Sequence, residues 1–76
     1  MQEAAQAAVR TLGRAVRKER ERMRLSQEDF AERCDLHRTY VGQVERGEKN
    51  ISVENILKIS KALSMKPSRL FQRAKL

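Results

Sequence analysis

Two short segments of helical apolar spacing, joined by a tight turn in the middle of the chain, most constrain the fold. In the first, Phe30, Ala31 and Cys34 form an apolar stripe behind Ser26, a residue type that caps helix N-termini. We therefore expect a helix that ends near Cys34 or Asp35, because aspartate is one of the few non-glycine residues that tolerate a left-handed backbone. Ala31 is small enough to let a second helix cross this one closely.

The second segment follows the turn at residues 35–37 and covers about residues 38–46. Gly47 is expected to end it as a C-terminal glycine cap. Its apolar residues, Val41 and Val44, are expected to face the first segment. Two short helices joined by a turn of this length form a helix-turn-helix.

The remaining segments are also helical in their spacing. We expect helices over about residues 2–24, from the Ser52 cap to about Leu63, and from Pro67 to about Lys75. The residues expected to face inward are Ala5, Val9, Leu12, Val16 and Met23 in the first of these, and Val53, Ile56, Leu57, Ile59 and Leu63 in the second. Residues 1–76 thus predict one all-α domain of five helices without strands.

Charge and residue counts restrict the function. The formal net charge of +7 favours a polyanionic partner such as DNA, RNA or an anionic membrane surface. One cysteine excludes an internal disulfide, and one histidine beside it leaves too few ligands for a structural zinc site. Without a glycine-rich phosphate loop or a catalytic triad, we expect no enzyme, no cofactor and no small-molecule ligand. Residues 1–9 are too short and polar to span a bilayer, so we expect a cytoplasmic protein.

The outward face of the expected segment 38–46 carries the strongest functional signal. If the valines face inward, a rotation of about 100° per residue turns Arg38, Thr39, Gly42, Gln43 and Arg46 outward. Arginine can donate two hydrogen bonds to guanine, glutamine can pair with adenine, and threonine suits thymine. The alternative interpretation of this face is a polar stripe that only meets solvent.

Several segments also fall at the spacing of one known family: LSQEDFA at 25–31, VERG at 44–47, ISVENIL at 51–57 and PSRLF at 67–71. Over residues 12–71 the chain resembles the lambda-repressor/Cro, or Xre-like, helix-turn-helix family. Residues 38–47 are especially similar to restriction–modification controller proteins. The resemblance implies a compact five-helix domain, with residues 1–11 extending its first helix. It also implies a transcriptional regulator that binds a palindromic operator in double-stranded DNA.

The resemblance assigns DNA contacts to individual positions. Gln27 matches a residue that binds a DNA phosphate at a helix N-terminus. Arg38, Thr39 and Gln43 match positions that read base edges. Positions that match contacts to the DNA backbone are Tyr40, Arg46, Lys49 and Asn50. Tyr40 could equally pack over the turn without touching DNA.

Three further features of the resemblance concern structure. Arg20 and Glu45 match a partly buried salt bridge between the first and third helices. Asp35 stands where the family usually has glycine, and His37 stands at a helix cap where serine, threonine or aspartate is commoner. His37 could contact phosphate when protonated, or could simply be exposed.

One short recognition helix reads too few base pairs to specify a site, and family members solve this by forming dimers. We expect a homodimer whose interface comes from the C-terminal part of the chain. Its candidate residues are Ile59, Met65, Leu70, Phe71 and Leu76. The alternative is that these residues only complete the core of the monomer. Two other functions stay open: an antitoxin or protein-binding module with the same fold, and a basic helix at 10–24 that binds an anionic membrane.

Overall fold

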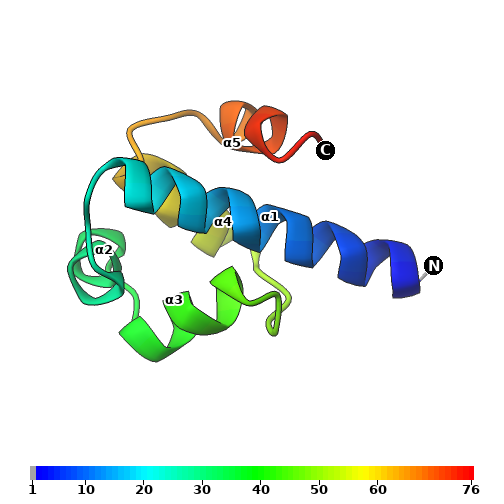
Figure 1. The fold of residues 1–76 in the computed structure, drawn as a ribbon, viewed down its shortest axis with the longest axis horizontal. Coiled ribbons are helices and arrows are strands. Elements are labelled where there is room, and N and C mark those ends of the chain that lie inside the picture. The colour runs from blue at the N-terminus through cyan, green and yellow to red at the C-terminus, as the bar shows by residue number, and fades with distance from the viewer. Residues whose placement is uncertain (1) are drawn as a thin grey trace.

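The computed structural model describes residues 2–76, and within this range the chain forms five helices and no strand (Figure 1). The helices are α1 (Gln2–Arg22), α2 (Gln27–Cys34), α3 (Arg38–Glu45), α4 (Val53–Ala62) and α5 (Pro67–Arg73). Their number and order are those expected from the sequence. The first helix ends two residues earlier than expected, because Arg24 adopts a left-handed backbone with φ of 59°.

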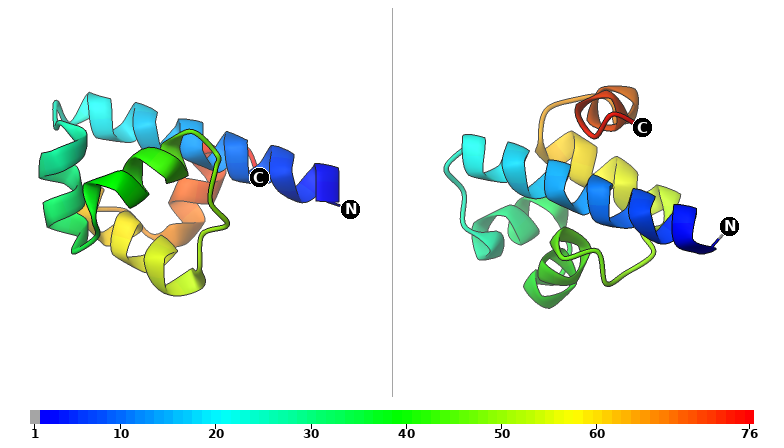
Figure 2. Two further views of the ribbon diagram at one scale, coloured as in Figure 1. Left: turned by 90° about the horizontal axis from the view of Figure 1, so that it is seen from below. Right: turned by 45° about the vertical axis from the view of Figure 1, so that its right-hand side comes forward.

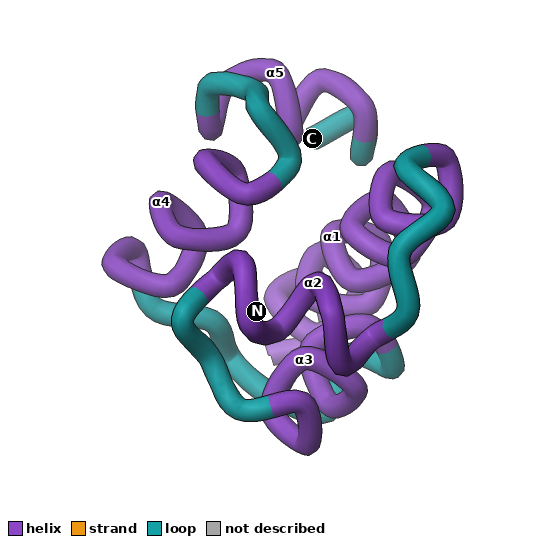
Figure 3. Tube along the Cα trace, turned by 90° about the vertical axis from the view of Figure 1, so that its left-hand side faces the viewer, coloured by secondary structure: helices purple, strands orange, loops and turns teal. Residues whose placement is uncertain are grey.

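The helices surround a single core in a body of 34 × 23 × 20 Å. Helix α1 packs against α3 on one side and α5 on the other, while α2 packs against α3 and α4, and α4 against α5 (Figures 1 and 2). Viewed from the end where α1 stops, α2 lies in front and α3 below it (Figure 3). The first turns of α1 extend beyond this body, so Ala5 is exposed. The expectation that Ala5 faces inward is therefore wrong.

The core draws apolar residues from every helix. Its buried members are Leu12, Ala15, Val16, Phe30, Ala31, Cys34, Val41, Val44, Ile59, Leu63, Leu70 and Ala74. The expectation that Val53 and Leu57 face inward is wrong, because their side chains are 73% and 52% exposed. Ile59 of α4 and Leu63, which follows the helix as its C-cap, face the core instead. The arc of apolar residues is wider than one packed face, so its edge lies in solvent.

The expected dimer residues divide into three groups by burial. Ile59 and Leu70 are 0% exposed in the monomer, so they have no surface to offer a second subunit, and their assignment to the interface is corrected. Met65 and Phe71 are partly buried against the core. Leu76 is 54% exposed. Ile59 and Leu70 therefore complete the core of the monomer, as the alternative interpretation allowed.

Helix ends follow the capping residues of the sequence. Ser26 Oγ accepts a hydrogen bond from the backbone N–H of Asp29 at 3.0 Å, and Ser52 Oγ accepts one from Asn55 at 3.1 Å. Asp35 takes the left-handed conformation at the end of α2, with φ of 57° and ψ of 44°. Asp35 therefore makes the turn after α2, at the position where the resembling family usually has glycine.

Helix α1 approaches the end of α3 closely at Gly13. A Cβ atom at this position would lie 3.0 Å from the carbonyl oxygen of Glu45, and nearer still to that of Val44. Glycine is required here because the nearest neighbours are backbone atoms, which cannot rotate away as a side chain can. This close approach determines how α3 is oriented on α1.

Candidate nucleic-acid interface

The α2–α3 pair presents one face of α3 outward and anchors the other. Val41 and Val44 are 0% and 2% exposed, and Ala31 of α2 is 2% exposed, so the inner face is fully packed. On the opposite face Arg38 and Thr39 are exposed, as the helical spacing predicted. A rigid element that holds a polar face in solvent can dock that face against another surface without rearranging its own core.

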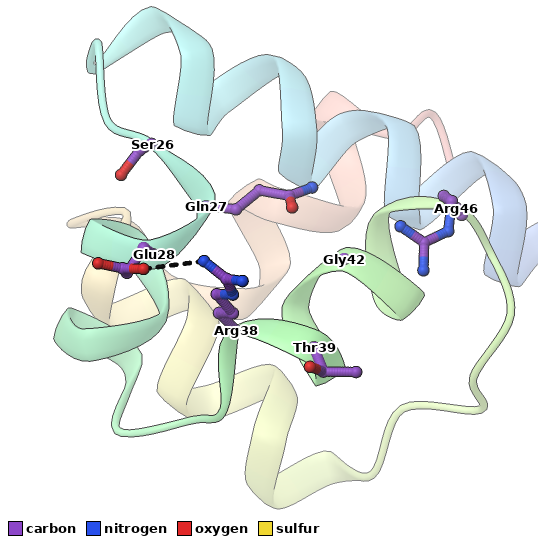
Figure 4. A pocket seen from close by; sticks show the side chains of 7 residues that line it. All are labelled: Ser26, Gln27, Glu28, Arg38, Thr39, Gly42 and Arg46. Carbon is purple, nitrogen blue, oxygen red and sulfur yellow. Dashed lines mark hydrogen bonds and ion pairs between the residues drawn. The ribbon is translucent and has the colours of Figure 1, made fainter.

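An open pocket with a volume of about 610 Å³ lies between the start of α2 and the outer face of α3 (Figure 4). We call it the α2–α3 notch. It is lined by Ser26, Gln27, Glu28, Arg38, Thr39, Gly42 and Arg46. The structure thus brings together one predicted phosphate contact, two of the three predicted base readers and one predicted backbone contact. Gln43, the third predicted base reader, is half-buried and does not line the notch.

Gly42 forms the floor of the notch and is buried, although the helical spacing had placed it outward. A Cβ atom here would lie 3.1 Å from Nη1 of Arg46 and 3.4 Å from Oε1 of Gln27. The absence of a side chain therefore keeps the space between these two residues open. Arg38 and Arg46 lie on either side of Gly42 (Figure 4).

A buried ion pair supports the notch from behind. Arg20 donates from Nε and Nη2 to the two carboxylate oxygens of Glu45, at 2.7 and 3.0 Å. Arg20 Nη1 also donates to the carbonyl oxygen of Leu25 at 2.7 Å, which ties α1 to the segment that leads into α2. These side chains are only 9% and 1% exposed. Hydrogen bonding to Glu45 raises the pKa of Arg20, and desolvation opposes the rise.

Gln27 joins this pair. Its Nε2 donates to Oε1 of Glu45 at 3.0 Å, so the side-chain amide is held against the protein. The backbone N–H groups at the start of α2 have no partner within their own helix and carry the positive end of its dipole. The predicted phosphate contact of Gln27 therefore has a fixed amide beside a helix N-terminus.

Each of the two arginines that line the notch is paired with a carboxylate. Arg38 Nη1 lies 2.9 Å from Oε2 of Glu28, and Arg46 Nε lies 2.9 Å from Oε2 of Glu48. Hydrogen bonding between Arg46 and Glu48 raises the pKa of the guanidinium and lowers the pKa of the carboxyl. The sequence reasoning missed both glutamates. Glu48 lies two residues from its arginine and could have been noticed, whereas Glu28 lies on another helix.

Two of the remaining predicted positions take part in contacts that hold α3. Tyr40 is half-buried, and its hydroxyl accepts a hydrogen bond from Nδ2 of Asn55 on α4 at 3.0 Å. His37 is exposed, and its Nδ1 accepts from the backbone N–H of Thr39 at 3.2 Å, so it caps α3 in place of the commoner serine, threonine or aspartate. Lys49 and Asn50 are exposed in the loop between α3 and α4.

Two other kinds of site find no support in the described residues. Residues 2–76 contain no group of three or more side chains suited to holding a metal ion. None of their helices combines the length and the apolar character needed to cross a membrane. The basic segment of α1 is also not a uniform cationic face, because Arg20 and Glu19 are buried.

Comparison with known proteins places this arrangement in a family. Residues 16–70 match the family described as Helix-turn-helix. Among curated proteins, the Control protein C.BamHI of Bacillus amyloliquefaciens is 56% identical over 46 residues, which span 60% of this chain and 57% of that protein. The Control protein C.SmaI of Serratia marcescens is 42% identical over 62 residues, which span 82% of this chain and 74% of that protein.

A solved structure agrees with these relatives in fold. The restriction-modification controller protein C.AhdI from Aeromonas hydrophila superposes with a TM-score of 0.83 at 45% sequence identity, over 86% of this chain and 98% of that one. The match covers all but a small part of both chains, and the sequence identity is well above the level at which only a fold is shared. This chain therefore belongs to the helix-turn-helix family, among the relatives of restriction–modification controller proteins.

Proposed function

We propose that this protein is a transcriptional regulator of the restriction–modification controller type, which binds double-stranded DNA in a sequence-specific way. In this proposal α3 enters the major groove, and Arg38, Thr39 and Gln43 read base edges. Gln27 and the start of α2 bind a phosphate. The observation that carries the proposal is the outer face of α3, where Arg38 and Thr39 are exposed while the valines are fully packed behind them.

The charge of the chain supports the same conclusion. A net charge of +7 on 76 residues attracts the DNA backbone, and several lysine and arginine contacts to phosphate make affinity fall steeply with salt. Positions proposed to contact the DNA backbone beside the notch are Tyr40, Arg46, Lys49 and Asn50. The Tyr40 hydroxyl accepts a hydrogen bond from Asn55, which leaves its own O–H available to donate to a phosphate.

The protein binds as a homodimer to an inverted repeat in this proposal, with two recognition helices about 34 Å apart on one face of the duplex. Apolar side chains supply the surface: the exposed Val53 and Leu57 on α4 and Leu76, together with the half-buried Met65. A groove of about 550 Å³ beside Leu57 and Met65 continues this surface between α4 and α5. Phe71 is half-buried and can contribute its exposed edge.

The decisive experiment is the selection of bound sites from random duplexes. We expect the wild type to select an inverted repeat, and Arg38→Ala and Gln43→Ala each to lose about 1–3 kcal/mol and to relax preference at particular base pairs. Lys49→Ala is the matched control, because loss of a phosphate contact weakens binding evenly over all sequences. A selected sequence that both base-reading variants leave unchanged would refute the assignment.

The dimer is tested separately by sedimentation. Leu57→Glu places a charge in the proposed interface without touching the core, so it should shift the protein toward monomer and weaken binding to the full repeat. Glu54→Gln is a control on the same helix, because its side chain is 79% exposed and carries no apolar surface. A wild type that stays monomeric both free and on DNA would contradict this part of the proposal.

A further inference from the structure

The ion pair between Glu28 and Arg38 joins two helices at the rim of the α2–α3 notch (Figure 4). The two side chains are 70% and 65% exposed, so the contact holds the guanidinium without enclosing it. A guanidinium carries five N–H donors, and this contact uses one nitrogen, Nη1. Its other donors make no hydrogen bond to the described residues.

Glu28 is itself well placed to act as a fixed point. It is the second residue of α2, whose N-terminus is capped by Ser26, and a negative charge there is stabilised by the helix dipole. A carboxylate on a surface that meets phosphates would, taken alone, only repel the ligand. Its contact with Arg38 gives this carboxylate a use that offsets the repulsion.

We infer that Glu28 is a positioning residue that orients Arg38 toward one base pair, and so determines specificity without touching the DNA itself. This inference rests on the proposed function. A free arginine side chain samples many rotamers, and ordering it at the moment of binding opposes the contact. A guanidinium already held from behind loses less freedom when its remaining donors meet a base edge, so correct and incorrect base pairs are better distinguished.

The test separates this effect from simple charge removal. Glu28→Gln keeps the length of the side chain and removes its charge, so binding to all duplexes should tighten at low salt. At the base pair read by Arg38, however, the ratio of affinities for the preferred and substituted pairs should fall by about fivefold. A loss of discrimination at one position, combined with a general gain in affinity, is not produced by charge alone.

A matched pair elsewhere provides the control. Arg17 and Glu21 on α1 form an ion pair at 3.2 Å with side chains 62% and 55% exposed, and neither lines the notch. Glu21→Gln therefore changes the net charge by the same amount and should leave every base preference unchanged. In the Arg38→Ala background, Glu28→Gln should cause no further loss of discrimination, because the residue it positions is gone.

The outcomes are distinguishable. If the wild type prefers no base pair at any position, the proposed function itself fails. If Arg38→Ala abolishes one preference and Glu28→Gln leaves that ratio unchanged, the inference about Glu28 fails alone. If Glu28→Gln still alters a preference in the Arg38→Ala background, Glu28 contacts a base directly and the positioning role is overturned. Unfolding in urea verifies that Glu28→Gln is folded, as its exposure leads us to expect.

Discussion

Replacement of Gly13 by alanine tests the close approach of α1 to the end of α3. In an open helix this change stabilises by about 1 kcal/mol, because glycine is a poor helix former. Here the new Cβ would meet the carbonyl groups of Val44 and Glu45, the latter at 3.0 Å, and these backbone atoms cannot rotate away. Overpacking costs about 1–3 kcal/mol, and a contact with backbone belongs at the upper end, so the net expectation is a loss of about 2 kcal/mol.

That loss is large for a chain of this size. At roughly 0.05–0.15 kcal/mol per residue the whole domain is stabilised by about 4–11 kcal/mol. A loss of 2 kcal/mol should lower the Tm by about 8–16 °C. Urea unfolding followed by far-UV circular dichroism measures the free energy directly. Since α3 must shift to relieve the contact, DNA affinity should fall as well.

Gly42→Ala is the matched control for Gly13→Ala. Its Cβ would lie 3.1 Å from Nη1 of Arg46, the mobile end of a side chain at the edge of an open notch. We expect this variant to keep or slightly raise its free energy of unfolding, in line with helix propensity. If Gly13→Ala proves as stable as Gly42→Ala, then α1 and α3 approach less closely than described and the reasoning is refuted.

Three further predictions concern buried or strained groups. Glu45→Ala should lower the free energy of unfolding by about 3–5 kcal/mol, because it strands the buried guanidinium of Arg20, whereas Glu21→Ala should lose no more than about 1 kcal/mol; equal losses in urea would contradict this. Burial raises the pKa of Cys34 from 9.0 to about 11, so its thiol should react with a disulfide reagent at pH 8 only as fast as the protein unfolds. The free energy of unfolding should also decrease between about pH 9 and 11, because only the unfolded thiol ionises there. Rapid labelling of Cys34 in native buffer would contradict this prediction, because it would show an accessible thiolate. Asp35→Gly should raise the free energy of unfolding by about 0.5–1 kcal/mol, because glycine adopts the left-handed backbone without strain, and Asp35→Ala, which keeps that strain, should show no such gain in the same urea assay.

The sequence carried most of the fold because its local signals are unambiguous. Serine caps, the proline at the start of α5 and the aspartate that ends α2 each act through their own or adjacent backbone groups. Val41 and Val44 identified the inner face of α3, since helical spacing alone divides a short helix into two sides. These features depend on neighbours a few residues away, and such neighbours can be read from a single chain.

Features that depend on distant neighbours could not be predicted in this way. Helical spacing does not distinguish an apolar residue that faces the core from one at the exposed edge of the same arc, so the inward orientation predicted for Val53 and Leu57 was wrong. The contact of Glu28 with Arg38 joins separate helices. The need for glycine at position 13 arises from the backbone at the end of α3, since helix propensity alone disfavours glycine there. In each case the deciding neighbours lie outside the element that carries the residue.

The hydrogen bond between Tyr40 and Asn55 has a consequence for the length of the operator. It ties the helix proposed to read DNA to the helix that carries the proposed dimer surface. A dimer built on α4 would therefore hold its two α3 helices at a fixed separation. It would bind only operators whose half-sites have that spacing. Tyr40→Phe removes this hydrogen bond while keeping the ring. A dimer of this variant, in which α3 is held less firmly on α4, would accept operators with one base pair added or removed between the half-sites.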